Sequence, residues 1–410
     1  MRWIAIFFLL SCGVVRGDSL APMALYLSWV GDPTETMGVF WHTDVADQRS
    51  EVTYRRVGEQ AWVQQKGVSV QLPQSSVLVH GVQLEGLEAD AEYEFQVWPG
   101  TPAYRFKTMP KTLAHPIRFV VGGDAYFYLN RFKKMCAQIA AQSPDFVVVG
   151  GDIAYTHGRR GIFKGKSWAL ERWATFFQVW KDVMVTRDGR LIPLVPVVGN
   201  HDVRAIKYNR DHRDFVFFDL FFFLTEERTY RALDFGNYLS LFLLDTGHVF
   251  HIEGAQTEWL KGAMAQRENV AYKLAAYHIS AFPSVYPYDG ATPKLIRENW
   301  LPLFERYHLQ CAFEHHNHAY KRTYPIKNLK QDPDGVIYLG DGSWGVSPRK
   351  PRRDWYVKRV AQDNAVFLIT MGAQESHVEA LSLRGRVIDQ VDLSPTKRQV
   401  SFNEHLLLQR

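Results

Sequence analysis

The stretch DFVVVGGDIAY, residues 145–155, joins an apolar run to two glycines, an acid and, three residues later, a tyrosine. The apolar part, residues 146–149, is short and uninterrupted, which is typical of a buried strand. Polar residues that follow such a strand lie at its carboxyl end, where Asp152 is found. A single acid in this position is more often a turn former than a ligand. Asp152 therefore needs partners from other strands before it indicates a site.

The same pattern recurs through the second part of the chain. Six further apolar runs predict strands, at residues 117–124, 192–202, 238–246, 272–280, 310–318 and 335–342. Amphipathic helical patterns separate several of them, at residues 131–142, 168–183, 254–266 and 294–307. Strands that alternate with helices predict a layered α/β domain, which we expect over residues 115–395, followed by a tail at 396–410.

Polar side chains stand at five of these predicted strand ends. They are Asp124, Asp152, Asn200, His278 and the pair His316 and His318 within AFEHHNHAYKR, residues 312–322. His316 and His318 are separated by one residue. On an extended loop, residues i and i+2 face the same way, so both imidazoles could reach one site. Carboxylates and neutral imidazoles buried together without a cation carry a large desolvation penalty. The set therefore favours a metal cluster at the carboxyl ends of the strands.

The amino-terminal part has a different sequence pattern. Between residues 22 and 107, short aromatic and β-branched runs alternate with turn residues, which predicts an antiparallel sandwich. Leu87 followed by Tyr93 resembles the tyrosine corner of fibronectin type III domains. We expect an all-β, fibronectin type III-like domain over residues 18–110, with a scaffolding role in which Trp41 and Tyr93 belong to the core.

The first residues, MRWIAIFFLLSCGVVRG at 1–17, have the pattern of a secretory signal peptide. Their apolar run is too short to span a membrane, which takes roughly 20 residues. The sequence LLSC ending at Cys12 loosely resembles a bacterial lipoprotein box, which would tether the protein, but simple export is favoured. We expect a secreted, periplasmic or cell-surface protein without a transmembrane span.

Charge and cysteine usage narrow the class of protein. The 410 residues carry a net charge of +5, and loss of Arg2 and Arg16 with the signal peptide would leave +3. That balance is not typical of a nucleic-acid-binding protein. Cys136 and Cys311 lie in apolar runs, where a free cysteine packs as a small hydrophobe, so no disulfide framework is expected.

The polar blocks also resemble a known family. The segments are GGD at 122–124, GGDIAY at 150–155, GNHD at 199–202, YHIS at 277–280 and HHNHAYKR at 315–322. In this order they resemble the five motif blocks of the calcineurin-like metallophosphoesterases, and most closely those of purple acid phosphatases. The resemblance implies an αββα sandwich in the second domain and the family's amino-terminal sandwich in the first. It also implies a centre of two metal ions, Fe(III) and a divalent Zn, Fe or Mn.

The same resemblance implies which residues hold each ion. A ferric site would use Asp124, Asp152, Tyr155 and His318. A divalent site would use Asp152, Asn200, His278 and His316, with Asp152 shared between the two. Tyr155 decides the subclass. Ordinary members of the superfamily have a ligand histidine in the first block, whereas purple acid phosphatases lack it and use a tyrosine three residues after the aspartate of the second block.

Other positions near these blocks allow more than one interpretation. His201 resembles the family's substrate-contacting histidine and possible proton donor, although it could instead be a supporting hydrogen-bond partner. His315 replaces a family glycine and could support the ligands or face the substrate. Tyr126 replaces a glycine or a ligand histidine, and could line the pocket, narrow it or compete as a ligand.

Two further stretches could contact a substrate or a membrane. His157, Arg159 and Arg160, in the loop after Tyr155, could hold a second phosphate or an acidic leaving group, or form a solvated basic loop. The aromatic segment FVFFDLFFFL at 215–224 could touch lipid, but it is interrupted by Asp219 and is more often core.

The family resemblance implies a hydrolase of small phosphate monoesters. Two metal ions about 3.5 to 4 Å apart can clamp a phosphate ester and lower the pKa of a bound water toward about 7. A phosphodiesterase or nucleotide pyrophosphatase is the alternative enzyme. An adhesion protein with a catalytically silent metal site is the alternative outside enzymes. The oligomeric state is left open.

Overall fold

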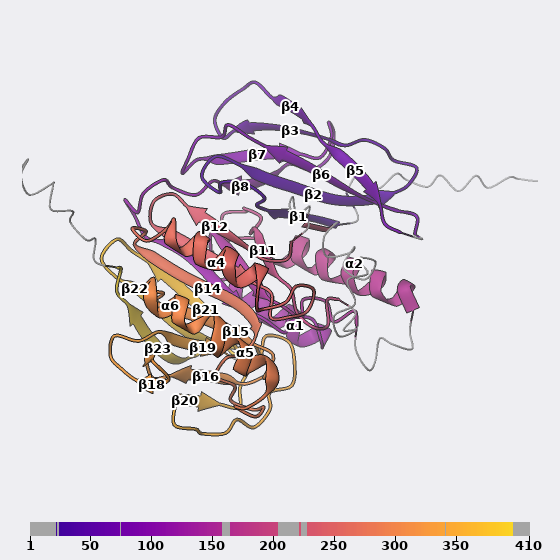
Figure 1. Cartoon of the computed structure of the whole chain (residues 1–410). Helices are drawn as coiled ribbons and strands as arrows, with labels where there is room; N and C mark the ends of the chain where they lie inside the picture. Colours follow the sequence, from indigo (N-terminus) through magenta and orange to yellow (C-terminus); the bar gives the residue numbers. More distant parts are fainter. Residues whose placement is uncertain are drawn as a thin grey trace, which may run out of the picture.

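The computed structural model describes residues 22, 24–73, 75–157, 165–203, 221–222, 228–340 and 342–396. The chain forms a β-sandwich that sits on a larger two-sheet domain (Figure 1). Several predictions fall outside the described residues: the signal peptide with Cys12, the loop residues Arg159 and Arg160, most of the aromatic segment 215–224, and the tail after Thr396.

The amino-terminal sandwich consists of two antiparallel sheets, each with four strands, in the orders β1-β2-β6-β5 and β4-β3-β7-β8. The strands are β1 (Ala24–Ser28), β2 (Met37–Asp44), β3 (Glu51–Arg56), β4 (Val63–Lys66), β5 (Val68–Gln71), β6 (Val77–Leu84), β7 (Glu92–Gln96) and β8 (Tyr104–Lys107). The buried hydroxyl of Tyr93 accepts a hydrogen bond from the backbone N–H of Glu88 at 2.9 Å. That bond closes the predicted tyrosine corner beside buried Leu87.

The second domain contains two mixed sheets. The six-stranded sheet has the order β11-β10-β9-β21-β22-β23 and the seven-stranded sheet the order β12-β13-β14-β15-β19-β16-β20. All seven predicted strands are present, as β9 (Ile117–Gly122), β10 (Phe146–Gly150), β11 (Leu194–Val197), β13 (Leu239–Leu244), β14 (Tyr272–Ile279), β15 (Cys311–His315) and β19 (Ile337–Gly340). Within each sheet, neighbours in this set pair in parallel, so their carboxyl ends lie at one edge.

The sheets face one another and helices cover both outer sides, which confirms the αββα architecture (Figure 1). Phe119, Phe146, Leu241 and Phe313 belong to one buried cluster between the sheets. Helices α1 (Leu129–Ala140) and α2 (Gly165–Val183) pack on one side, and α4 (Ala255–Ala265), α5 (Ala291–Asn299) and α6 (Leu301–Arg306) on the other. The single helix expected at 294–307 is two helices, because Pro302 begins a new first turn.

The remaining strands were not anticipated from sequence. They are β12 (Arg231–Phe235), β16 (Tyr320–Thr323), β17 (Ile326–Lys327), β18 (Lys330–Gln331), β20 (Val357–Ala361), β21 (Ala365–Met371), β22 (Ser376–Ser382) and β23 (Val387–Leu393). Strand β21 pairs antiparallel with β9 and extends its sheet through β22 and β23. Because β21, β22 and β23 carry no motif and follow β19, the last parallel strand, only their pairing reveals their place in the sheet.

The two domains are joined by an aromatic contact. The ring of Tyr26 in β1 stacks on Phe177 in α2 with centroids 3.9 Å apart, and its hydroxyl donates to the backbone oxygen of Phe221 at 2.7 Å. Phe221 and Phe222 are buried, so these two residues of the aromatic segment belong to the core. Cys136 and Cys311 are also buried and free, as expected.

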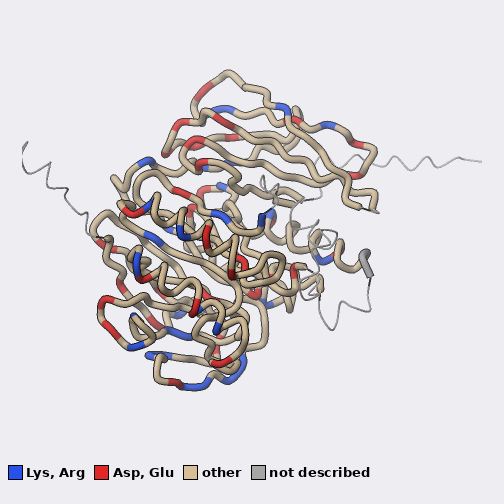
Figure 2. The backbone as a smooth tube through the Cα atoms, viewed as in Figure 1, with Lys and Arg blue, Asp and Glu red and all other residues tan. Residues whose placement is uncertain are grey.

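Lys and Arg are interspersed with Asp and Glu over both domains (Figure 2). Among the described residues, no helix has the length and apolar character that crossing a membrane would take.

Candidate metal centre

Strands β9, β10, β11, β14 and β15 bring their carboxyl ends together between the two sheets. Five of the polar residues that follow β9, β10 and β15 adopt left-handed backbone conformations, which non-glycine residues seldom do. The φ angle is +57° at Asp124, +52° at both Asp152 and Tyr155, +76° at His316 and +61° at His318. Such conformations cost on the order of 1 kcal/mol each and persist where the surroundings fix them, often at functional sites.

One group of donors consists of Asp124, Tyr155 and His318. The Tyr155 hydroxyl lies 2.8 Å from Asp124 Oδ1 and 3.1 Å from His318 Nε2, and Nε2 lies 2.8 Å from the same carboxylate oxygen. The second carboxylate oxygen, Oδ2, accepts from the backbone N–H of His316 at 2.8 Å. These three side chains, predicted for the ferric site, therefore meet at one point.

A second group consists of Asp152, His278 and His316, whose ligand atoms all lie within 4.8 Å of one another. Asn200 joins them, since its side-chain oxygen lies 3.1 Å from His278 Nε2. The other ring nitrogen of His278, Nδ1, lies 3.0 Å from the Gly150 carbonyl oxygen, which fixes the ring. The four residues predicted for the divalent site are thus adjacent.

Some buried polar atoms in this centre lack a protein partner. Asp152 Oδ2 and His316 Nδ1 are both buried and have no hydrogen-bond partner among the residues that the structure describes. A buried carboxylate oxygen and imidazole nitrogen left in this state carry a desolvation cost that a coordinated cation removes. Carboxylate, phenol, amide and imidazole donors suit iron and zinc, so the residues present fit the implied metals.

Burial and neighbouring charges shift the pKa values of three groups in the centre. Burial tends to raise the pKa of Asp152, but the imidazoles of His278 and His201 lower it below its usual value. Burial opposes protonation of His278, yet Asp152 raises the pKa of that imidazole to about 9. Burial and the nearby Asp124 carboxylate raise the pKa of Tyr155 well above 10. Phenolate ligation by Tyr155 would therefore need the charge of a bound metal.

Glycines let the ligand loops approach one another closely. A Cβ atom at Gly150 would lie 1.8 Å from His315 Nε2, and one at Gly151 would lie 2.5 Å from His278 Nδ1. At Gly342, a Cβ atom would lie 1.9 Å from Asp124 Oδ2. Gly150 and Gly151 thus make room for two imidazole rings, and Gly342 makes room for a carboxylate.

Two residues expected near the substrate are buried instead. His315 is fully buried against Gly150, and neither ring nitrogen has a hydrogen-bond partner within the described ranges. The position of its ring beneath the ligand loops favours the supporting role of His315 over the substrate-facing one. Tyr126 is also buried, stacked on Phe132 and covered by the Arg172 guanidinium at 3.9 Å from its ring centroid. It is a packed wall residue and not an open substrate contact.

His201 lies at the edge of the centre. Its backbone N–H donates to Asp152 Oδ1 at 2.7 Å, and its ring stacks on Tyr155 with centroids 4.8 Å apart. The ring is 29% exposed, and its Nε2 lies 3.8 Å from Asp152 Oδ2. The His157 carbonyl oxygen contacts His201 Nδ1, and the His157 backbone N–H donates to the His201 carbonyl at 3.0 Å. His157 therefore orients His201 through its backbone.

Sequence reasoning missed two residues beside the centre. The Tyr286 ring stacks on His316 with centroids 5.0 Å apart, and its hydroxyl accepts a hydrogen bond from Arg349. The Arg349 backbone N–H donates to the His318 carbonyl at 2.7 Å. Neither residue belongs to a polar block at a strand end, so no local signal marked them.

Comparison with known proteins agrees with this description. Residues 22–108 match the family described as "Purple acid Phosphatase, N-terminal domain", and residues 117–320 match "Calcineurin-like phosphoesterase". Together the two matched regions span more than half of the chain.

Curated relatives are also similar to this chain. Purple acid phosphatase 15 of Arabidopsis thaliana is 24% identical over 65% of this chain and 54% of its own length. Purple acid phosphatase 18 of the same plant is 23% identical over 84% of this chain and 77% of its own length. The chain thus spans about half the length of the first relative and about three quarters of the second.

A solved structure has the same fold. A purple acid phosphatase from yellow lupin (Lupinus luteus) seeds superposes with a TM-score of 0.76 over 91% of this chain and 74% of that one, at 18% identity.

Proposed function

The chain belongs to the calcineurin-like metallophosphoesterase superfamily as a purple acid phosphatase-like protein, and from this premise we propose that it hydrolyses phosphate monoesters. One observation carries the proposal most directly. Two donor groups, one around Asp124 and one around Asp152, lie side by side at the carboxyl ends of the central strands. A centre of two metal ions is the arrangement that both the family and these donors support.

We assign Asp124, Tyr155 and His318 to an Fe(III) ion, and Asn200, His278 and His316 to a divalent Zn, Fe or Mn ion. Asp152 is assigned to both ions. Its Oδ1 lies 3.4 Å from His278 Nε2, and its Oδ2 has no hydrogen-bond partner among the described residues. When bound, such a pair of ions supplies Lewis-acid activation of the ester and a nucleophilic water of lowered pKa. Carboxylate and phenolate oxygens suit the harder ion and imidazoles the softer one.

The protein's own residues would complete the reaction. His201 is partly exposed and held by the His157 carbonyl oxygen at Nδ1, so its Nε2 is the atom available to protonate a leaving group. Asn200 is a neutral ligand, which limits the negative charge that would repel a phosphate ester. Tyr286 and Arg349 border the His316 side of the centre, where they would contact part of a bound substrate.

The site of action is also a proposal. The pattern at residues 1–17 supports export through a signal peptide, with a secreted, periplasmic or cell-surface location. The substrate would be a small phosphate ester outside the cytoplasm.

Turnover of two chromogenic esters tests the activity. The purified, metal-loaded protein is expected to hydrolyse para-nitrophenyl phosphate at least tenfold faster than bis(para-nitrophenyl) phosphate. A reversed preference would identify a phosphodiesterase. Failure to hydrolyse either ester with two metal ions bound would contradict the proposal and favour a silent metal site.

A further inference from the structure

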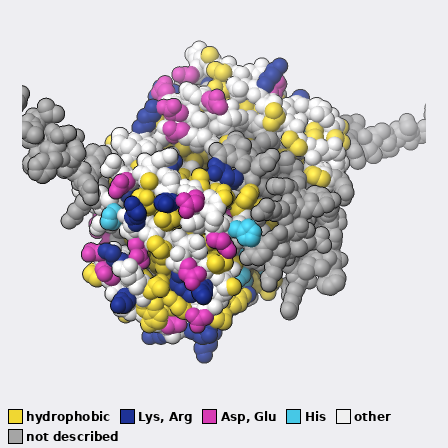
Figure 3. Space-filling view, in the orientation of Figure 1, with side chains coloured by type: hydrophobic (Ala, Val, Ile, Leu, Met, Phe, Trp, Pro, Cys, Tyr) yellow, Lys and Arg dark blue, Asp and Glu magenta, His cyan; other side chains and the backbone are white. Residues whose placement is uncertain are grey.

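A cavity lies away from the metal centre, between the two domains. Its volume is about 430 Å³, within the range of small-molecule sites. It opens beside β12 and α4, where basic and hydrophobic side chains gather on the surface (Figure 3). Its lining includes Val30, Arg228, Tyr230, Arg231, Trp259 and Arg267. None of these residues belongs to the metal centre.

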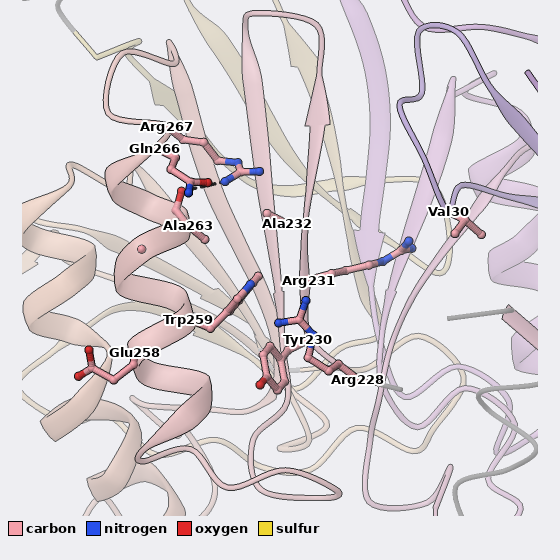
Figure 4. A pocket seen from close by; sticks show the side chains of 11 residues that line it. Val30, Arg228, Tyr230, Arg231, Ala232, Glu258, Trp259, Ala263, Gln266 and Arg267 are labelled. Carbon is pink, nitrogen blue, oxygen red and sulfur yellow. Dashed lines mark hydrogen bonds between the residues drawn. The ribbon is translucent and has the colours of Figure 1, made fainter. Parts of the chain in front are cut away.

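The charge balance of this cavity favours an anion. Arg231 extends toward Val30 of the sandwich (Figure 4), and its Nη1 donates to the Trp29 backbone oxygen at 2.6 Å. In the part of the chain that the structure describes, no carboxylate bonds to Arg231. Burial lowers the pKa of this guanidinium to about 10.

Among the described residues, the acids close to the cavity do not pair with Arg231. Asp234 accepts two hydrogen bonds of 2.7 Å from Arg267, in a bidentate pair. Glu258 lines the cavity, but its exposed side chain points away from Arg231 (Figure 4) and lies 3.8 Å from Lys261 on the same helix. Neither carboxylate neutralises Arg231, so a positive charge faces the cavity.

Aromatic rings form the other wall. Trp259 points from α4 toward β12, with Tyr230 below it (Figure 4), and their ring centroids lie 5.0 Å apart. The Arg228 guanidinium lies over both rings, 5.3 Å from Tyr230 and 5.7 Å from Trp259. Flat rings beside a guanidinium, with Trp259 half-buried and Tyr230 buried beneath it, favour a ligand with a planar apolar part, because such surfaces stack well.

We propose that this cavity binds a small organic anion with an aromatic ring, whose acidic group bonds to Arg231 and whose ring contacts Trp259. A sulfonate, carboxylate or phosphate would each satisfy Arg231 through charge-assisted hydrogen bonds. The ligand would bridge the domains, since Arg231 lies in β12 and Val30 follows β1. This site is independent of phosphate-ester hydrolysis.

Isothermal titration calorimetry of the full-length, metal-loaded protein with 2-naphthalenesulfonate tests the proposal. This probe contains no ester that the metal centre could hydrolyse. We expect saturable binding of one molecule per chain, with sulfate and naphthalene-2-methanol each binding at least tenfold more weakly. Arg231→Met and Trp259→Leu should each weaken binding about tenfold or more, as expected for losing a charge-assisted bond or an aromatic wall.

Controls separate this site from the metal centre. Lys294→Met, which removes an exposed lysine of α5, should leave the affinity unchanged, and so should Asp152→Asn. Trp259→Leu does not touch the interdomain bond of Arg231, so it remains informative if Arg231→Met fails to fold. Absence of saturable binding, equal affinity for sulfate, full affinity in both cavity variants, or loss of binding in Asp152→Asn would each overturn the proposal.

Discussion

The hydroxyl of Tyr155 lies 2.8 Å from Asp124 Oδ1, although these residues are 31 positions apart and follow different strands. Both adopt left-handed backbone conformations that direct their side chains into one buried space. In the structure this contact is a hydrogen bond in which the phenol donates. With iron bound, both oxygens would become ligands of the same ion.

The first prediction concerns the colour of the protein. Iron-loaded protein should show a visible charge-transfer band, because a ferric ion can hold Tyr155 as phenolate. Tyr155→Phe should abolish the band. Tyr126→Phe should retain it, since Tyr126 is buried under Arg172 and stacked on Phe132. Absorption spectra of the three proteins decide between the two tyrosines, and a band lost only in Tyr126→Phe would contradict the assignment.

A second prediction concerns the proton donor. His201→Ala should lower kcat on para-nitrophenyl phosphate by about a hundredfold or more, the usual size of a general acid's contribution. The metal content should remain unchanged, because His201 contacts Asp152 through its backbone N–H, which alanine keeps. His377→Ala, which removes an exposed histidine paired with Asp392, is the matched control. Loss of metal together with activity would assign His201 a ligand-supporting role instead.

A third prediction concerns the glycines beneath the ligands. Gly150→Ala should lower the free energy of unfolding by about 3 kcal/mol or more, since overpacking of a rigid core is costly. The new Cβ atom would lie 1.8 Å from His315 Nε2. Gly262→Ala is the control, because it lies in α4 with nothing within 4 Å and should stabilise by about 0.5 to 1 kcal/mol. Urea unfolding of both variants checks this, and equal stability would contradict the predicted crowding.

A fourth prediction concerns acid stability of the sandwich. Burial lowers the pKa of His42 to about 3 and that of His80 to about 4, and neighbouring histidine charge adds to the effect at His42. An unfolded histidine has a pKa near 6.5, so the unfolded chain binds more protons between these values. The stabilising effect of burying neutral histidines is therefore present above pH 6.5 and lost as the pH falls toward 4.

The variant His80→Gln isolates one of these groups. For each histidine, the free energy of unfolding should fall by up to about 1.4 kcal/mol per pH unit in that window. His80→Gln should make this decline shallower, at the cost of the contacts that His80 makes with Thr43 and Ser50. Urea unfolding at pH 6.5, 5.5 and 4.5 measures the slope, and equal slopes in both proteins would refute the prediction.

Much of the second domain was predictable because its strands are buried on both faces. The runs at β9, β10 and β14 are mainly apolar, and a polar residue of the centre stands at or just after the end of each. That pattern favours a metal centre at the carboxyl ends of these strands. Strands β21 to β23 could not be placed from sequence. Their position depends on the antiparallel pairing of β21 with β9, which joins residues far apart in the sequence.

The centre itself was only partly predictable. The motif resemblance indicated the ligands, but the roles of His315 and Tyr126 depended on packing that spacing does not determine. His315 is buried because Gly123 and Gly150 leave space for its ring. Tyr286 and Arg349 reach the centre from loops that carry no motif, so only the three-dimensional arrangement identifies them.

Metal analysis tests the central claim, that Asp152 is shared by two ions. Elemental analysis of the purified protein should find two metal ions per chain, at least one of them iron, together with turnover of para-nitrophenyl phosphate. Asp152→Asn should lose metal from both sites and reduce kcat by at least a hundredfold, while Asp392→Asn, an exposed control, keeps both. A folded wild-type protein that takes up no iron, or an Asp152→Asn variant that retains both ions and full activity, would contradict the account.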